Sequence, residues 1–184
     1  MKQIIRKQKK EERNLMSKQD VLDKSYSACE NFLKSEPYRK SKVLMLYMPL
    51  GNETDPSEII RSAYQDGKKV VFPVTEEKSG LISPRYAQAD TSFLKGGFSV
   101  MEPVGTRVAE KGEIDTVLVP GIAFDRQGNR IGFGKGCYDQ FLCGISAVTV
   151  GFCYEFQLCS FLPSEPTDQS LDFIVTEKEM FECK

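Results

Sequence analysis

The chain has 184 residues, of which 40% are hydrophobic, and this size predicts one domain over residues 1–184 with a single well-filled core. Its 25 lysines and arginines are balanced by 26 acidic residues, which argues against nucleic-acid binding driven by bulk charge. No apolar run reaches the roughly 20 residues that span a bilayer, and the N-terminus is charged, so we expect a cytoplasmic protein that does not bind membranes.

The sequence has no histidine, and its six cysteines form no C-x-x-C pair, which predicts buried free thiols rather than a zinc site. Without histidine, the Ser-His and Cys-His catalytic pairs are excluded. Chemistry in this chain must therefore rest on carboxylates, lysine, arginine, tyrosine, backbone amides or a bound metal.

Helix and strand patterns alternate in the N-terminal half. The first thirteen residues predict a basic helix, for which a solvated charged face is the simplest interpretation. Ser17 and Asp20 form a capping-box pattern before a second helix that ends near Leu33. Next come an apolar strand at 43–48, a helix capped by Asp55 and ended by Gly67, and a strand at 70–73. Such a strand–helix–strand unit is typical of parallel sheets with right-handed crossovers.

The pattern weakens after this unit and then recovers. Residues 81–87 favour a strand and residues 93–103 an irregular stretch, so the topology of residues 76–112 stays open. Further strands are predicted at 114–119, 147–152 and 171–176, with a helix at 138–142 and a polar tail at the end. This alternation predicts an α/β fold, a three-layer α/β/α sandwich with a mostly parallel sheet.

A glycine-rich segment follows the predicted strand at 114–119, in the sequence PGIAFDRQGNRIGFGKGCYD. Gly132, Gly134 and Gly136 remove side-chain bulk so that backbone N–H groups can close on phosphate oxygens, and Lys135 adds a mobile positive charge. The helix that follows adds its positive dipole end. The loop is neither a Walker A sequence nor a dinucleotide fingerprint, and the pattern alone also fits a purely structural turn.

Three carboxylates are expected near this loop. Asp139 lies just beyond it, where it could hold Mg²⁺ or merely favour the helix dipole. Glu53 should emerge at the same edge of the sheet and could hydrogen-bond a heterocycle with adjacent N–H donors, although a solvated turn residue fits equally well. Asp168 could approach the same edge, but a surface loop is the more common arrangement.

Together these residues resemble the 5-formyltetrahydrofolate cyclo-ligase family, also called methenyltetrahydrofolate synthetases. The resemblance rests on four features: the glycine-rich segment, the N-E-T-D turn at 52–55 with its helix and GKKVVFP strand, the ending LP.E..D..LD.IVTE, and the basic first helix. It spans nearly the whole chain. It implies a fold of the sugar-phosphate isomerase and CoA-transferase type.

The resemblance also implies an ATP- and Mg²⁺-dependent reaction. ATP phosphorylates the formyl oxygen of 5-formyltetrahydrofolate, with or without a polyglutamate chain, and a neighbouring nitrogen then displaces phosphate. The products are 5,10-methenyltetrahydrofolate, ADP and phosphate. No protein nucleophile is needed, which agrees with a sequence that lacks histidine. We expect a monomer or a weak homodimer.

The resemblance carries site roles over to this chain. The residues implied to bind ATP are Lys2, Arg6, Arg130, Gly132, Gly134, Lys135, Gly136, Cys137 and Tyr138. Those implied to bind the folate are Met48, Glu53, Phe133, Gly134, Lys135, Gly136 and Cys137. Lys135 and Tyr138 are the implied catalytic residues, and Asp139 and Asp168 the implied metal ligands.

Three positions depart from the family pattern. Phe133 replaces an arginine that helps to neutralise the transferring phosphate, Cys137 replaces a tyrosine, and Thr167 replaces a histidine. These changes leave room for slower catalysis, an altered substrate or another basic residue in place of the arginine. Two alternatives remain: an enzyme related to sugar-phosphate isomerases or CoA transferases, for which we find no base or nucleophile motif, and a non-catalytic folate- or nucleotide-binding protein.

Overall fold

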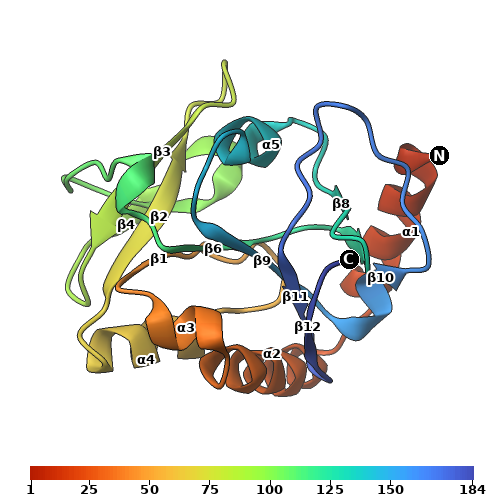
Figure 1. The fold of residues 1–184 in the computed structure, drawn as a ribbon, viewed down its shortest axis with the longest axis horizontal. Coiled ribbons are helices and arrows are strands. Elements are labelled where there is room, and N and C mark those ends of the chain that lie inside the picture. Colours follow the sequence, from red (N-terminus) through yellow and green to blue (C-terminus); the bar gives the residue numbers. More distant parts are fainter.

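A computed structural model describes residues 1–184 and is built around a seven-stranded sheet (Figure 1). The strand order is β12-β11-β9-β6-β1-β2-β3. The strands are β1 (Val43–Met45), β2 (Lys69–Thr75), β3 (Ile82–Ala87), β6 (Thr116–Val119), β9 (Val148–Phe152), β11 (Phe173–Val175) and β12 (Met180–Glu182). All neighbours pair in parallel except the edge strands β3 and β12. The mostly parallel α/β fold predicted from the sequence is confirmed.

Helices cover the sheet unequally. The helices α2 (Lys18–Leu33), α3 (Glu36–Lys40) and α4 (Ser57–Gln65) lie on one face (Figure 1). The other face carries the short α5 (Cys137–Leu142) and a small sheet of order β10-β7-β8. Its strands are β7 (Ala123–Asp125), β8 (Arg130–Ile131) and β10 (Leu158–Cys159). The layer on this face is therefore thinner than the one formed by α2, α3 and α4.

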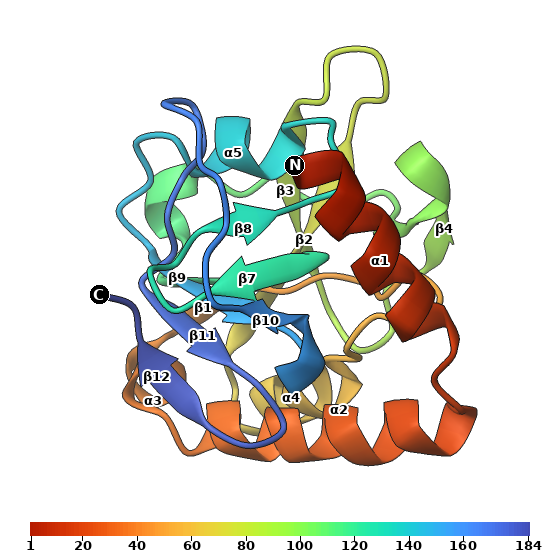
Figure 2. The same ribbon diagram turned by 90° about the vertical axis from the view of Figure 1, so that its right-hand side faces the viewer.

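The basic N-terminal helix stands apart from both layers. Figure 2 shows α1 (Lys2–Asn14) beside the small sheet, at the edge of the molecule. No helix of the structure combines the length and the apolar character that crossing a membrane requires.

Local signals in the sequence place the helix ends. The predicted capping box is present, because Ser17 Oγ accepts a bond from Asp20 N (3.1 Å) while Asp20 Oδ2 accepts one from Ser17 N (3.4 Å). Asp55 Oδ1 accepts from Ser57 N (2.9 Å) at the start of α4. Gly67 follows this helix with φ +69°, a left-handed conformation that suits glycine.

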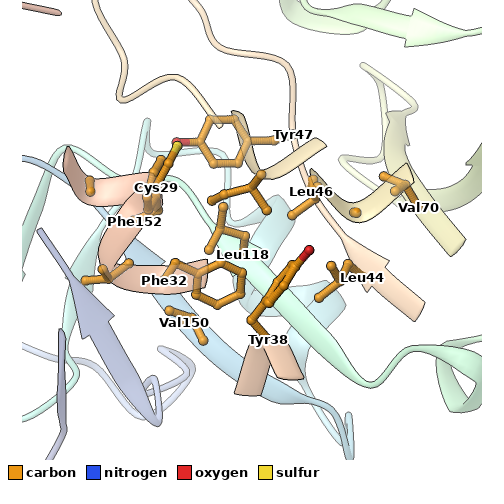
Figure 3. Packing of buried hydrophobic residues seen from close by; sticks show 14 of the residues in the cluster. Cys29, Phe32, Tyr38, Leu44, Leu46, Tyr47, Val70, Leu118, Val150 and Phe152 are labelled. Carbon is orange, nitrogen blue, oxygen red and sulfur yellow. The ribbon is translucent and has the colours of Figure 1, made fainter. Parts of the chain in front are cut away.

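The sheet separates two apolar cores. Leu44 and Leu46 face the helices α2, α3 and α4, whereas Val43 and Met45 belong to the cluster on the α5 side. Figure 3 shows Leu44 and Leu46 among Phe32 and other buried side chains of the first core. A continuous apolar run thus becomes a strand that is buried on both faces.

Several elements differ from the prediction. The apolar run at 43–48 forms a strand only to Met45 and then continues as a loop toward the site. The stretch at 93–103 is a hairpin of β4 (Phe93–Lys95) and β5 (Met101–Pro103), joined by a short helical turn at Gly97–Ser99. The tail contains β12, and the hairpin of β7 and β8 lies between β6 and the glycine loop. These short elements depend on pairing with distant strands, which local periodicity does not register.

Two further helical turns, at Lys111–Glu113 and Glu155–Gln157, complete the structure. All six cysteines are unpaired, but only Cys29 and Cys153 are buried, so the prediction of buried thiols is wrong for the other four.

Candidate functional site

A cavity of about 1240 Å³ lies between α1, the glycine loop and the turn after β1. Ligand pockets for one drug-sized molecule usually measure about 300–1,000 Å³, so this cavity is larger than one such molecule requires. Every residue to which the family resemblance assigns a role lines it: Lys2, Arg6, Met48, Glu53, Arg130, Gly132, Phe133, Gly134, Lys135, Gly136, Cys137, Tyr138, Asp139 and Asp168. The fold brings together residues from the two ends of the chain.

The glycine loop connects β8 to α5 and forms one wall of the cavity. Gly134 and Gly136 have φ of +93° and +68°, so other residues would be strained there. A Cβ atom at Gly132 would come within 2.5 Å of Arg130 Nη1. Arg6 Nε donates to the carbonyl oxygen of Gly132 (2.8 Å), so α1 holds the loop in place. Glycine is required for the conformation of this wall as well as for access to its backbone.

Four cations reach the cavity, and three of them are already engaged with the protein. Lys2 Nζ donates to Asp168 Oδ2 (2.6 Å), Arg130 Nη2 donates to Asp139 Oδ1 (2.9 Å), and Arg6 binds the loop as described. Lys135 has no hydrogen bond or ion pair, and its Nζ lies 5.9 Å from the centre of the Phe98 ring. Lys135 is therefore the cation most available to an anionic ligand.

Asp139 and Asp168 both line the cavity, and each is paired with a cation through one oxygen, so each has a second carboxylate oxygen for a metal ion. Burial alone would raise the pKa of Asp168, but the hydrogen bonds from Lys2 and from the Glu165 N–H hold this pKa below its ordinary value. No cluster of three acidic or sulfur side chains is present. Mg²⁺ is commonly held by one or two carboxylates together with phosphate oxygens and water, which is the arrangement that these residues allow.

Glu53 lies in the turn after β1, and its side chain is almost completely buried at 5% exposed. The interpretation as a solvated turn residue is therefore wrong. Its Oε2 accepts from Leu50 N (2.9 Å), while Oε1 has no hydrogen-bond partner. Burial raises the pKa of Glu53, and nearby Arg13 opposes this shift. The only ionic contact of Oε1 is with Arg13 Nη1 at 3.5 Å, so this buried oxygen can still accept a hydrogen bond from a ligand.

Buried tyrosines hold this turn rigidly. Tyr154 Oη donates to the carbonyl oxygen of Glu53 (3.2 Å), and Tyr47 Oη donates to that of Thr54 (2.7 Å). Tyr154 comes from a distant part of the chain and Tyr47 from the start of the same loop, so the Glu53 backbone is held both by a long-range and by a local hydrogen bond.

Tyr138 places a second unpaired polar group at the cavity. Its hydroxyl is buried without a hydrogen-bond partner, and burial raises the pKa of this group. The phenol therefore stays protonated and can donate a hydrogen bond to a ligand.

Phe133, at the arginine position of the family pattern, is 45% exposed. Lys10 Nζ and Arg13 Cζ lie 5.7 Å and 5.8 Å from the centre of its ring. Two cations thus lie close to the place where the family pattern has one. Cys137 and Thr167, the other two departures, also line the cavity.

Sequence reasoning missed an apolar wall formed by the hairpin of β4 and β5. Phe98 and Val100 line the cavity opposite the glycine loop. Phe98 has φ +53° and its N–H donates to Glu77 Oε1 (2.8 Å). A left-handed aromatic residue is uncommon, and such strain is concentrated at functional sites. Gly96 and Gly97 before the aromatic residue are the signal that could have indicated a tight turn here.

Comparisons with known proteins agree with this geometry. A model of the 5-formyltetrahydrofolate cyclo-ligase family matches residues 1–177. The 5-formyltetrahydrofolate cyclo-ligase of Haemophilus influenzae is 32% identical over 152 residues, which cover 79% of this chain and 81% of that protein. The enzyme of Saccharomyces cerevisiae is 30% identical, with 95% of this chain and 94% of that protein covered.

A solved structure has the same fold. The structure of 5,10-methenyltetrahydrofolate synthetase from Aquifex aeolicus superposes with a TM-score of 0.86 at 30% identity, and the match covers 100% of this chain and 93% of that one. Since the family model, the relatives and the fold agree over nearly the whole length, this chain belongs to the 5-formyltetrahydrofolate cyclo-ligase family of enzymes.

Proposed function

We propose that this protein catalyses the ATP- and Mg²⁺-dependent cyclisation of 5-formyltetrahydrofolate to 5,10-methenyltetrahydrofolate, with release of ADP and phosphate. The observation that carries the proposal is that two kinds of binding group line the same cavity. This cavity holds a glycine loop with the unpaired cation Lys135, and also Glu53, whose buried Oε1 lies 3.5 Å from Arg13 but accepts no hydrogen bond from the protein. The first suits a phosphate chain, and the second suits a heterocycle with N–H groups.

The nucleotide half of the site is formed by α1 and the glycine loop. Lys2, Arg6 and Arg130 surround the loop, and the first turn of α5 adds its positive dipole end. Lys135 can approach a transferring phosphoryl group without breaking a bond to the protein. The backbone N–H groups of Gly132, Gly134, Gly136 and Cys137 provide the remaining donors.

The folate half of the site is formed by the turn after β1 and the other side of the loop. Glu53 accepts hydrogen bonds from the pterin ring, and Met48 and Phe133 provide apolar contact surface. Because the glycine loop borders both halves, Gly134, Lys135, Gly136 and Cys137 contact both ligands. This shared border keeps the formyl group next to the terminal phosphate.

The reaction then needs positioning and charge neutralisation rather than a protein nucleophile. ATP supplies the phosphoryl group: the formyl oxygen attacks the terminal phosphorus, and the bond to ADP breaks. In this phosphorylated intermediate, the neighbouring N–H nitrogen attacks the formyl carbon and loses its proton to solvent or to the departing phosphate, and the carbon–oxygen bond to phosphate breaks. Lys135 neutralises charge on the phosphoryl group, and the Tyr138 hydroxyl, which faces Glu53, donates a hydrogen bond to the reacting ligands. Asp139 and Asp168 hold Mg²⁺.

We further propose that residues 1–184 act as one domain, in the cytoplasm, as a monomer or weak homodimer, on folates with or without a polyglutamate chain. Small molecules are its partners, and neither nucleic acid nor membranes are. The balanced charge supports the exclusion of nucleic acid, and the cavity supports small-molecule partners.

The test is direct. Purified protein is incubated with 5-formyltetrahydrofolate, Mg²⁺ and ATP, and the methenyl product is followed by its absorbance. We expect product only when all three are present. Binding of both ligands without product would contradict the enzyme proposal and favour a non-catalytic binding protein, the alternative that the replacement of arginine by Phe133 supports.

A further inference from the structure

The last turn of α1 meets the turn that carries Glu53 at a buried contact behind the cavity wall. Arg13 is 5% exposed, and its Nη1 lies 3.5 Å from Glu53 Oε1, while its Nε has no hydrogen-bond partner. Asn52 Nδ2 donates to the carbonyl oxygens of Arg13 (3.1 Å) and Met16 (3.2 Å). Burying a guanidinium and a carboxylate costs desolvation energy, so a contact of this kind is poorly explained by stability alone.

The same guanidinium also touches the glycine loop. Arg13 Cζ lies 5.8 Å from the centre of the Phe133 ring, on a residue that lines the cavity. Arg13 therefore lies between Glu53, on the turn after β1, and Phe133, on the glycine loop that borders the same cavity. Lys10 also approaches this ring at 5.7 Å, but it is exposed and has no contact with Glu53.

Few charged or titratable groups face Glu53. They are Arg13 from α1, the hydroxyl of Tyr47 from the loop after β1, and the hydroxyl of Tyr138 from α5. Burial raises the pKa of Glu53, and Arg13 is the cation that opposes the shift. Without Arg13 the carboxyl group would therefore become protonated at a higher pH. A protonated carboxyl group loses acceptor capacity for ligand N–H groups.

We propose that Arg13 is a positioning residue for folate binding, which holds the Glu53 carboxylate ionised and oriented toward the ligand and keeps the Phe133 wall in place beside it. This proposal rests on the proposed function, in which Glu53 anchors the pterin ring. Arg13 does not line the cavity, so it acts through Glu53 and Phe133 and not on the ligand itself.

The experiment compares Arg13→Met with Lys10→Met. The first removes the partner of Glu53, and the second removes a cation from the Phe133 ring but leaves the Glu53 contact. The KM for each substrate and the kcat are measured between about pH 6 and pH 9. For Arg13→Met we expect the KM for 5-formyltetrahydrofolate to rise at least about tenfold at neutral pH, as for loss of one member of a buried charge pair.

The pH dependence separates positioning from a merely structural role. In Arg13→Met the KM for 5-formyltetrahydrofolate should rise further as the pH falls, because Glu53 protonates at a higher pH than in the wild type. The KM for ATP and the kcat should change less than about twofold. Lys10→Met should keep the wild-type pH dependence of the KM for 5-formyltetrahydrofolate. Arg13→Lys, which retains the charge, should show the same wild-type pH dependence. In the Glu53→Gln background, Arg13→Met should produce no pH-dependent change.

A wild-type pH profile in folded Arg13→Met would overturn the proposal. If that variant does not fold, Arg13→Gln provides the same comparison with better hydrogen bonding, and an unchanged profile there counts equally against it. Failure of the wild type to form methenyl product would contradict the proposed function instead. The role of Arg13 is then decided by calorimetric binding of 5-formyltetrahydrofolate over the same pH range.

Discussion

Lys135 and Glu53 differ in their solvent exposure and in the contacts that they make with the protein. Lys135 is exposed and has no ion pair, so its ammonium group can move to an anion at little cost. Glu53 is 5% exposed and keeps one oxygen without a hydrogen bond, so its position is set and a ligand donor must approach it. A mobile cation suits a phosphate whose charge shifts during reaction, while a rigid acceptor suits recognition of a heterocycle.

Replacing Lys135 tests the first of these roles. Lys135→Ala should lower kcat at least about a hundredfold, the scale of removing one charge-stabilising donor from a transition state. Its thermal midpoint should stay near that of the wild type, because the side chain makes no bond in the fold. Steady-state kinetics and thermal unfolding check both points, with the exposed Lys95→Ala as the control. Unchanged turnover would show that Lys135 is not part of the phosphate site.

Asp139 is the residue at which the metal assignment can be tested. Asp139→Asn should raise the Mg²⁺ concentration for half-maximal activity about tenfold, since a neutral amide binds a hard cation less well than a carboxylate. Activity is titrated with Mg²⁺ at fixed ATP, and Asp90→Asn on an exposed turn serves as the control. The same Mg²⁺ curve in both variants would show that Asp139 is not a ligand.

At the scale of elements, α1 contributes more than a solvated charged face. Lys2, Arg6, Lys9 and Arg13 fall on one side of a helix of about 3.6 residues per turn. Each one contacts the body of the protein, through Asp168, the Gly132 carbonyl, the Phe156 carbonyl and Glu53 respectively. The interpretation of this helix as wholly solvated is wrong for this side. These cations, together with Ile5, which packs against Ala123, Ile131 and Leu162, hold α1 beside the cavity.

Because Arg6 contacts the glycine loop and Lys7 faces solvent, replacing these neighbouring residues should affect the KM for ATP differently. Arg6→Ala should raise the KM for ATP about tenfold, because the loop loses the bond at Gly132 and the site loses a cation. Lys7→Ala, on the exposed side of the same helix, should behave like the wild type. Kinetics at low salt measure both variants. Equal effects at the two positions would mean that general charge, not docking, matters.

At the scale of the whole molecule, the apolar cores pack against the central sheet, whereas the candidate site lies at the edge of this sheet. Both cores lie against the same central strands, while the cavity is formed by loops and by α1. In open parallel sheets the carboxyl ends of strands collect such loops, so residues distant in sequence meet there. Stability and ligand binding can consequently be changed separately.

Phe32 in the first core tests this separation. It is fully buried and packs edge-on against Tyr38, with ring centres 5.7 Å apart. Phe32→Ala should lower the free energy of unfolding by about 3–5 kcal/mol, the usual cost of emptying such a site. Activity of the folded fraction should persist below the unfolding transition. Denaturant unfolding checks the first point, and Phe161→Ala, 65% exposed, is the control. A similar loss in both would contradict the assigned core.

The sequence was sufficient to predict those structural features whose physical cause lies within a few neighbouring residues. The capping box at Ser17, the glycine that ends α4, the start of the strand predicted at 43–48 and the glycine-rich turn before α5 all depend mainly on neighbouring residues. Periodicity and turn chemistry act over a few residues, so they could be predicted in advance.

The tertiary structure decided which of these features meet. The hairpin of β4 and β5, the edge strand β12 and the small sheet around β7 form only through pairing with distant strands, and local patterns did not reveal them. The sequence determined that Glu53 is a carboxylate and Arg13 a cation near the end of a helix. Only folding brought these two charges to 3.5 Å in a buried place, since electrostatic coupling depends on separation and solvent exclusion.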